Sequence, residues 1–473
     1  MATLEFPTAE QIKDLVEATR AGFKTGKTLS LDWRKKQLRG ILRFCREKHS
    51  QILEALEIDL GKSSFEGMTS EVVSVEWEAH FALKHLSRWA APEKVRTPLL
   101  HQPGRSYILK EPLGLVLIIG AWNYPVQLTL VPLVAAIAAG NAAVLKPSEV
   151  SEATSRLLAT ELPKYLDPNA FTVLQGGAEE TTEILKLPFD HIFYTGNPQV
   201  ARIVMEAAAK NLTPVTLELG GKSPCLVDES ADLALTAKRL IWGKFFNCGQ
   251  TCVAPDYLLV EKSVAEPLKT QLLKAVEKFW SGHPEIHSEY GRIVNSRHFD
   301  RIMGLLDNSG KVLCGGKGDK AKRYIAPTLI ADPPETSPLL KEEIFGPILP
   351  ILEVDSISEA VNYVNDRPKP LVLYLFSENP KTQEFVLNHT SSGGVVLNHC
   401  LLHNLSPDLP FGGVGESGIG AYHGKAGFEA LSHRKSVLKK PFYLDNPTIY
   451  PHLTGRLTKF TEQLIKIWRK VRA

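Results

Sequence analysis

Five short apolar runs constrain the fold of this chain more than any other feature of its sequence. They lie at residues 115–119, 142–145, 171–174, 191–194 and 215–219, and helical stretches separate them. A continuous apolar run of this length is typical of a strand that is buried on both faces. Strands that alternate with helices in this way predict a doubly wound parallel sheet, so the expected fold class is α/β.

A second α/β region begins near Gly221 and extends to about residue 425. It has helical patterns at residues 233–246 and 264–279 and a candidate strand at residues 257–260. Before the first strand, apolar residues recur at helical spacing between residues 32 and 60, which predicts amphipathic helices with Cys45 in their core. A chain of 473 residues is long enough for two or three domains.

Composition and charge exclude several classes of protein. The formal net charge of +3 is too small to indicate a nucleic-acid-binding surface, so no nucleic-acid partner is expected. Polar and small residues interrupt the apolar stretch 115–145, so it does not predict a membrane span. The first residues have neither a secretory nor a transit pattern, and six cysteines in so long a chain do not form a disulfide framework. The expected location is the cytoplasm.

Two of the cysteines, Cys248 and Cys252, lie together in the segment FNCGQTCVAPDY. Their spacing is one residue too long for a CxxC metal or redox pair, and no second pair completes a zinc site, so no metal is predicted. The neighbours of Cys252 are small and polar rather than apolar, which favours a nucleophile over a core residue.

Two glycine patterns lack the context that would give them a function. Residues 413–418 fit GxGxxG, but no strand precedes them and they lie far from the βαβ region. Residues 221–223 resemble the end of a P-loop, but Thr216 occupies the position of its first glycine. We therefore expect neither segment to bind phosphate.

Seven separated motifs agree on one family. They are AWNYP (121–125), KPSE (146–149), FYTGN (193–197), LELGGKSP (217–224), NCGQTCVAPDY (247–257), EEIFGP (342–347) and PFGGVGESG (410–418). In this order and spacing the chain resembles the aldehyde dehydrogenase superfamily. FYTGN, QTC followed by APDY, and GAYHGK (420–425) are similar to its class 3 branch, which includes the fatty aldehyde dehydrogenases.

The resemblance implies a covalent mechanism in which a thiolate adds to the aldehyde and the adduct releases hydride. It identifies Cys252 as the nucleophile, while Cys248 matches a position that is not catalytic. The side-chain amide of Asn123 and the backbone N–H of Cys252 would stabilise the alkoxide. Glu218 matches the base that activates water. In the class 3 branch Glu343 is the alternative for this role.

The resemblance also implies a nicotinamide cofactor. Lys146 and Glu149 match positions that hold the adenosine ribose, and Gly196 matches the turn near the pyrophosphate. Glu343 and Phe345 match residues around the nicotinamide ribose and ring. A carboxylate at Glu149 accepts hydrogen bonds from a ribose 2′-OH and repels a 2′-phosphate, which favours NAD, while Lys146 leaves NADP use open.

Three residues depart from the pattern of the branch. Ala201 stands where the branch usually has a second glycine, His399 where it has aspartate, and Pro407 where it has histidine. The last two border the expected substrate entrance, so the substrate preference of the branch does not transfer to this chain.

The resemblance divides the chain into four parts. An NAD(P)-binding domain comprises residues 1–94 and 111–220, and a catalytic domain comprises residues 221–425. Residues 95–110 and 426–445 form a small β arm that would join two copies as a homodimer. Residues 446–473 form a basic tail.

The tail has its own pattern. Apolar residues recur at helical spacing from Arg456 to Ala473, and six basic residues against Glu462 give this segment a net charge of +5. A basic amphipathic helix is typical of a segment that lies on a membrane surface. The alternatives are that it caps the substrate entrance or packs on a partner subunit. The protein is therefore expected in the cytoplasm or at the periphery of a membrane.

The sequence leads to one main hypothesis and two alternatives. The main one is NAD(P)-dependent oxidation of a medium-chain, long-chain or otherwise hydrophobic aldehyde to its carboxylic acid. The first alternative is an acylating enzyme that transfers the thioester to coenzyme A. The second is a binding protein that has kept the fold but not the activity.

Overall fold

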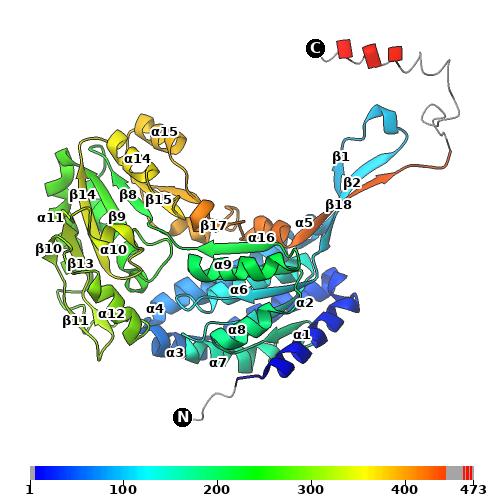
Figure 1. The fold of residues 1–473 in the computed structure, drawn as a ribbon, viewed down its shortest axis with the longest axis horizontal. Helices are drawn as coiled ribbons and strands as arrows, with labels where there is room; N and C mark the ends of the chain where they lie inside the picture. Colours follow the sequence, from blue (N-terminus) through cyan, green and yellow to red (C-terminus); the bar gives the residue numbers. More distant parts are fainter. Residues whose placement is uncertain (1–5, 444–461, 464, 468, 471–473) are drawn as a thin grey trace. The chain divides into compact units, whose positions relative to one another are not determined.

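The structure of the protein is a computed structural model that describes residues 6–443, 462–463, 465–467 and 469–470. The chain forms two compact units (Figure 1). Among the described residues, the larger unit contains those up to Ala90 and Glu111–His433, and the smaller contains Ala91–Lys110 and those from Arg434 onward.

The five predicted runs form the parallel part of a six-stranded sheet in the larger unit. These strands are β3 (Leu115–Ile119), β4 (Ala142–Lys146), β5 (Phe171–Val173), β6 (His191–Gly196) and β7 (Val215–Leu219), in the sheet order β17-β7-β6-β3-β4-β5. Every residue of β3 and β4 is buried. Because successive side chains point to opposite faces, both faces of the sheet are covered. The predicted α/β fold is confirmed.

Helices of the first half of the chain surround this sheet, some of them in contact with its strands and others packed on those helices. They are α1 (Ala9–Lys24), α2 (Leu31–Glu47), α3 (His49–Leu60), α4 (Ser64–Gly67), α5 (Val73–Ala90), α6 (Gln127–Ala139), α7 (Glu152–Glu161), α8 (Ala178–Leu185) and α9 (Pro198–Ala209). All residues of α6 are buried, because α2, α5 and β4 pack around it. Cys45 lies in the core of α2, as predicted. Among the described residues, no helix has both the length and the hydropathy needed to cross a membrane.

A seven-stranded sheet forms the other half of the larger unit (Figure 1). Its strands are β8 (Pro224–Val227), β9 (Tyr257–Glu261), β10 (Lys311–Cys314), β13 (Thr328–Ala331), β14 (Ile348–Val354), β15 (Val372–Phe376) and β16 (Gly394–Leu397), in the order β10-β13-β14-β9-β8-β15-β16. All neighbours are parallel except β10 and β13. The associated helices are α10 (Leu233–Phe245), α11 (Lys262–Phe279), α12 (Ser296–Gly304), α13 (Pro338–Lys341), α14 (Ile357–Asn365) and α15 (Pro380–His389), with a small hairpin of β11 (Gly318–Asp319) and β12 (Tyr324–Ile325).

The two sheets are joined end to end. β7 ends at Leu219 and β8 begins at Pro224, so the carboxyl edge of the first sheet leads directly to the amino edge of the second. Later in the chain, β17 (Gly418–Ile419) returns to pair antiparallel with β7, and α16 (Gly424–Ala430) packs against α6. The sequence assigned residues up to 425 to the second region, whereas β17 belongs to the first sheet. The domain limits therefore remain a prediction.

The smaller unit is built on a three-stranded sheet. β1 (Glu93–Val95), β2 (Arg105–Pro112) and β18 (Ser432–Lys439) lie side by side in this order within one chain, and β1 and β2 are antiparallel. The two segments predicted for the arm thus contribute to one sheet. The tail prediction for residues 456–473 falls largely outside the described residues, although residues 462–463, 465–467 and 469–470 are helical.

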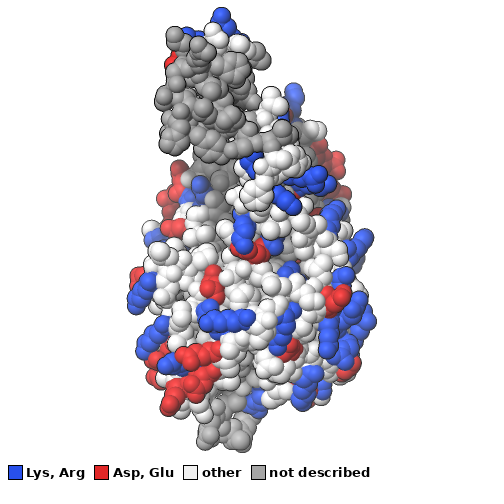
Figure 2. Space-filling model, turned by 90° about the vertical axis from the view of Figure 1, so that its right-hand side faces the viewer, with Lys and Arg blue, Asp and Glu red and all other residues white. Residues whose placement is uncertain are grey.

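Charged side chains of both signs are interspersed on the face shown in Figure 2, where blue lysine and arginine lie among red aspartate and glutamate. This mixture does not create a broad field of one sign on that face.

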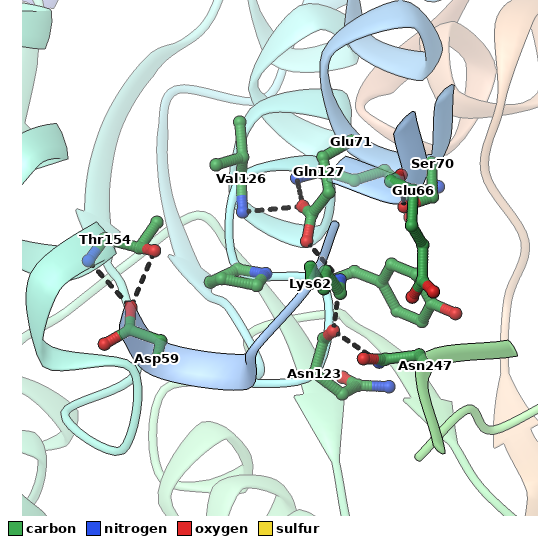
Figure 3. Close-up of polar contacts among 12 residues, drawn as sticks. Asp59, Lys62, Glu66, Ser70, Glu71, Asn123, Val126, Gln127, Thr154 and Asn247 are labelled. Carbon is green, nitrogen blue, oxygen red and sulfur yellow. Dashed lines mark hydrogen bonds and ion pairs between the residues drawn. The ribbon is translucent and has the colours of Figure 1, made fainter. Parts of the chain in front are cut away.

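Asp59 at the end of α3 caps α7 from outside. Its carboxylate accepts hydrogen bonds from the backbone N–H groups of Ala153 (3.0 Å) and Thr154 (2.9 Å) and from the Thr154 hydroxyl (2.8 Å), as Figure 3 shows in part. Ser151, which precedes α7, makes no capping bond with its side chain. Asp59 therefore satisfies the N–H groups that a helix leaves free at its start.

We expect Asp59→Ala to lower the free energy of unfolding by roughly 1–2 kcal/mol, the usual effect of losing a helix cap. Urea denaturation would measure it. Glu57→Ala, an exposed position on the same helix, is the control and should change little. Equal losses in both variants would show that the cap does not contribute.

Candidate active site

Four of the predicted site residues gather because the strands that carry them are parallel. Asn123 follows β3, Lys146 is the last residue of β4, and Gly196 is the last residue of β6. Glu218 is the residue before the last in β7. These carboxyl ends meet at one edge of the sheet. The order of the strands also reverses there, since β3 lies between β4 and β6. A crevice at such a point is where ligands bind in α/β sheets.

The loop that carries Cys252 comes from the facing edge of the second sheet. α10 ends at Phe245, and the next residues, Asn247, Cys248 and Gly249, all have positive φ angles of 51°, 53° and 71°. A side chain at Gly249 would collide with the carbonyl oxygen of Gly346, so the loop needs glycine there. The chain therefore turns sharply just before the candidate nucleophile.

Gln250 holds this loop in place. Its buried side-chain amide donates to the carbonyl oxygens of Asn247 (3.1 Å) and Arg292 (2.9 Å) and accepts from the backbone N–H of Val294 (2.9 Å). One side chain thus ties the loop to itself and to the segment after α11. Sequence reasoning did not single out this residue.

Asn123 lies beside the same loop. Its buried side-chain Nδ2 donates to the backbone carbonyl of Gln250 at 3.1 Å. An amide nitrogen carries two hydrogens, so one remains for a second acceptor. Next to it, the hydroxyl of Tyr124 bonds to Oγ1 of Thr251 at 2.7 Å, one residue before Cys252.

Cys252 is half-buried and lines a cavity of about 270 Å³. The other lining residues are Phe65, Thr69, Ser70, Ser74, Tyr124, Gln127, Leu128, Trp242, Phe246, Thr251, Val253, Leu401, Leu402, Asn404, Leu405, Phe411 and Tyr422. Most of them are apolar or aromatic. Cys248, in contrast, is fully buried and does not line the cavity, so only Cys252 is placed to meet a molecule there.

The site disfavours negative charge. Burial, together with the carboxylates of Glu343 and Glu218, raises the pKa of Cys252 to about 12. Burial also raises the pKa of Glu218 well above its usual value, and neither of its carboxylate oxygens has a hydrogen-bond partner among the described residues. Burial and the neighbouring Asp256 raise the pKa of Glu343 to about 8. Both carboxyl groups can therefore hold a proton near neutral pH.

The residues predicted for the cofactor fit such a ligand. The Lys146 ammonium pairs with the partly exposed carboxylate of Glu149 at 2.6 Å, which presents an acceptor and a donor for ribose hydroxyls. The buried hydroxyl of Thr195, beside Gly196, has no hydrogen-bond partner among the described residues, so a polar ligand group can satisfy it. A side chain at Gly220 would collide with the Glu343 carboxylate, which lies beside the β7–β8 connection.

Aromatic rings flank this part of the site. Phe345 has a positive φ of 44°, and its ring meets that of Trp122 edge to face with centroids 5.3 Å apart. The Trp122 ring also contacts the ring of His298, and the centroids of these two rings are 4.9 Å apart. Ala201, which departs from the pattern of the branch, is buried in the second turn of α9, and Asn197 caps the start of that helix. Among the described residues, no group of histidine, cysteine or acidic side chains could hold a metal ion.

Sequence reasoning missed a buried set of charges behind Asn123. Lys62, Glu66 and Glu71 are all buried, and Lys62 contacts the backbone carbonyl of Asn123 (Figure 3). Burial raises the pKa of Glu66 to about 7. The only signal in the sequence was the presence of charged residues close to an apolar helical stripe, and a solvated helix face gives the same signal.

The charges around Cys252 lead to a prediction about its reactivity. Glu343→Gln removes a negative charge near the sulfur, so the thiolate becomes easier to form and the pKa of Cys252 falls. We expect faster alkylation of Cys252 by iodoacetamide, with the largest gain above pH 8, where Glu343 is ionised in the unmodified protein. The pH profile of alkylation, followed by peptide mass spectrometry, measures this. The exposed neighbour Glu342→Gln is the control, and identical profiles for both variants would contradict the assignment.

Comparisons with known proteins agree with this site. The profile of the aldehyde dehydrogenase family matches residues 1–437. "Aldehyde dehydrogenase, dimeric NADP-preferring" of Canis lupus familiaris is 48% identical over 95% of this chain and 99% of its own length. "Aldehyde dehydrogenase family 3 member A2" of Pongo abelii is 49% identical over 90% of this chain and 87% of its own length. The family 3 member B1 of Mus musculus is 48% identical over 94% of this chain and 96% of its own length.

Solved structures show the same fold. The substrate-bound AldH of Staphylococcus aureus is 43% identical, with a TM-score of 0.93 over 96% of this chain and 99% of that chain. The aldehyde dehydrogenase KauB of Pseudomonas aeruginosa is 26% identical, with a TM-score of 0.85 over 93% of this chain and 91% of that chain. These findings confirm the resemblance to the class 3 branch. The chain belongs to the aldehyde dehydrogenase family and is an oxidoreductase that oxidises an aldehyde with NAD or NADP.

Proposed function

We propose that this chain oxidises a hydrophobic aldehyde, of medium or long chain or aromatic, to its carboxylic acid through a thioester on Cys252. The observation that carries the proposal is the cavity above Cys252, whose walls include Phe65, Trp242 and Phe246. Apolar walls favour an apolar ligand, because its transfer from water to the cavity is favourable.

The first step requires Cys252 to lose its proton and form a bond to the aldehyde carbon. The carbonyl oxygen then becomes an alkoxide, and the free N–H of the Asn123 amide and the backbone N–H of Cys252 stabilise it. Glu343 and Glu218 both raise the pKa of Cys252 through their negative charge. Whichever of them is ionised would accept the thiol proton and would pass it to solvent before the second half of the reaction. Exclusion of water from the apolar cavity strengthens these interactions.

The cofactor site is proposed on the residues at the carboxyl edge of the first sheet. NAD or NADP, when bound, supplies the acceptor for the hydride that leaves the tetrahedral carbon. Lys146 and Glu149 would hold the adenosine ribose, Gly196 would leave room for the pyrophosphate, and Glu343 and Phe345 would contact the nicotinamide end. Glu149 favours NAD and Lys146 tolerates NADP, so we expect use of both cofactors with NAD preferred.

The second half of the reaction is hydrolysis of the thioester. A base must take a proton from water as the water oxygen bonds to the acyl carbon. The carbon–sulfur bond then breaks, which releases the carboxylic acid and returns Cys252 as the leaving thiolate. Glu218 is the first candidate, because its carboxylate is buried without a partner and its raised pKa suits proton transfer. Glu343, with a pKa of about 8, is the second.

The parts of the chain are proposed to divide this work. Residues 1–94 and 111–220 would bind the cofactor, and residues 221–425 would carry the nucleophile. The arm of residues 95–110 and 426–445 would join two chains as a homodimer. A relative's name includes the word dimeric, which supports this proposal. The tail would contact a membrane surface, or else the substrate entrance or a partner subunit.

Cys252 and Cys248 provide the first test. Cys252→Ser should abolish aldehyde-dependent formation of NADH or NADPH, because a hydroxyl is a far weaker nucleophile than a thiolate. The matched variant Cys248→Ser should keep most of the activity. Loss of turnover with Cys248→Ser and retention with Cys252→Ser would reverse the assignment.

An aldehyde panel provides the second test. We expect turnover of decanal and benzaldehyde with a kcat/KM at least ten times that for acetaldehyde, measured by absorbance at constant cofactor. The panel is run with NAD and with NADP, and with and without the last 18 residues. Removal of the tail should alter KM for decanal more than for benzaldehyde if the tail lies near the entrance or a membrane.

The same assay separates the alternatives. A strict requirement for coenzyme A would show an acylating enzyme and reject hydrolysis by Glu218 or Glu343. Failure to reduce either cofactor with any aldehyde, together with an unreactive Cys252, would favour the non-catalytic binding protein.

A further inference from the structure

Lys62 and Glu71 form an ion pair that is sealed from solvent. The ammonium Nζ of Lys62 lies 2.6 Å from Oε1 of Glu71, and both side chains have an exposed fraction of 0%. Lys62 follows the end of α3, and Glu71 lies in a π-helical turn, Met68–Val72, that leads into α5. π-Helical turns recur at functional sites, so the contacts of this pair are relevant to function.

All three hydrogen-bond donors of the Lys62 ammonium are engaged by Glu71 and by residues 123–124. Besides Glu71, its Nζ donates to the backbone carbonyl of Asn123 at 2.9 Å and lies 3.9 Å from the centre of the Tyr124 ring. An ammonium has three donors, so the carboxylate, the carbonyl and the ring account for them. Figure 3 shows Lys62 between Glu71 and Asn123.

Glu71 binds the other end of the same turn. Its Oε2 accepts hydrogen bonds from the backbone N–H groups of Val126 (3.0 Å) and Gln127 (2.9 Å). These groups lie at the start of α6, where a negative charge is stabilised by the helix dipole. The ion pair therefore binds both ends of the turn formed by residues 123–127. Lys62 binds the carbonyl of residue 123, and Glu71 binds the amides of residues 126 and 127.

Hydrogen bonds also join the turn of residues 123–127 to the loop that precedes Cys252. Nδ2 of Asn247 donates both to the carbonyl of Asn123 (2.9 Å) and to the carbonyl of Gln250 (3.1 Å), and Nδ2 of Asn123 donates to the latter as well. With one of its hydrogens held by Gln250, the amide of Asn123 has a fixed plane. Its second hydrogen then has a fixed direction.

A role in stability alone does not account for this arrangement. Buried ion pairs add little to stability, since the desolvation of both charges offsets their attraction, and apolar side chains of similar volume often serve as well. An apolar pair could not bind a carbonyl oxygen and two N–H groups in set directions. The pair is thus suited to orientation rather than to packing.

We propose that Lys62 and Glu71 are positioning residues that hold Asn123 in the orientation in which its amide stabilises the alkoxide. The inference rests on the proposed function, because it presupposes that Asn123 donates to an alkoxide formed on Cys252. Neither residue of the pair touches the reacting atoms. Both act through the backbone of residues 123–127.

The test is a double-mutant cycle between the ion pair and Asn123. Lys62→Met with Glu71→Gln removes both charges, keeps similar side-chain volumes and leaves an amide oxygen to accept from the start of α6. We expect the first-turnover burst of NADH with decanal to slow about 10- to 100-fold, within the roughly 10²–10³-fold cost of losing an oxyanion donor. KM should change little. In an Asn123→Ala background the same double change should slow the burst less than about twofold.

Several measurements separate positioning from general damage. The melting temperature, the Kd for NAD and the rate of Cys252 alkylation should stay close to those of the unmodified protein. Lys269→Met is the matched control, because Lys269 pairs with Glu353 at 2.6 Å in another part of the unit, and its burst should be normal. If the double variant does not fold, the isosteric Glu71→Gln alone is used in the same cycle.

The outcomes distinguish the inference from the function on which it rests. An equal slowing in the presence and absence of the Asn123 side chain would overturn the positioning role while leaving the dehydrogenase function intact. An unaffected burst in the double variant would overturn it too. Absence of NADH formation by the unmodified protein would instead reject the proposed function.

Discussion

The direct passage from β7 into β8 is the constraint on which the rest of the site depends. With only residues 220–223 between them, the carboxyl edge of one parallel sheet must face the amino edge of the next. The first edge supplies Asn123, Lys146 and Glu218, and the second supplies the loop of Cys252. Gly220 allows the Glu343 carboxylate to lie against the β7–β8 connection, because any side chain at residue 220 would collide with it.

The electrostatics of the site follow from this enclosure. Burial raises the pKa values of Cys252, Glu218 and Glu343, so it favours the neutral form of each group. The Lys62–Glu71 ion pair is also fully buried, but it contacts the backbone of residues 123–127 and neither of its residues lines the cavity. In the proposed reaction, charge that develops on the substrate would meet hydrogen-bond donors whose positions are already fixed, so little reorganisation would be needed.

Sequence reasoning succeeded where burial leaves a strong periodic signal and failed where contacts are long-range. The strands β3 to β7 were predictable, because burial of both faces requires continuous apolar runs. Their shared carboxyl edge then placed Asn123 and Glu218 together. The pairing of β17 was not predictable, since two residues carry no periodicity. Lys62 and Glu71 were missed because their meaning depends on residues 123–127, which lie more than fifty positions away and whose backbone leaves no trace in the side-chain pattern.

The loop of Asn247, Cys248 and Gly249 has a left-handed backbone, and this limits which residues can replace them. Its backbone geometry tolerates few substitutions, because all three residues have positive φ angles, and hydrogen bonds from Gln250 fix the loop further. Another part of the cavity lining comes from Leu401, Leu402 and Leu405, which lie close in sequence to His399 and Pro407. Exchange of these leucines would therefore change the shape of the cavity without changing any of the proposed catalytic residues.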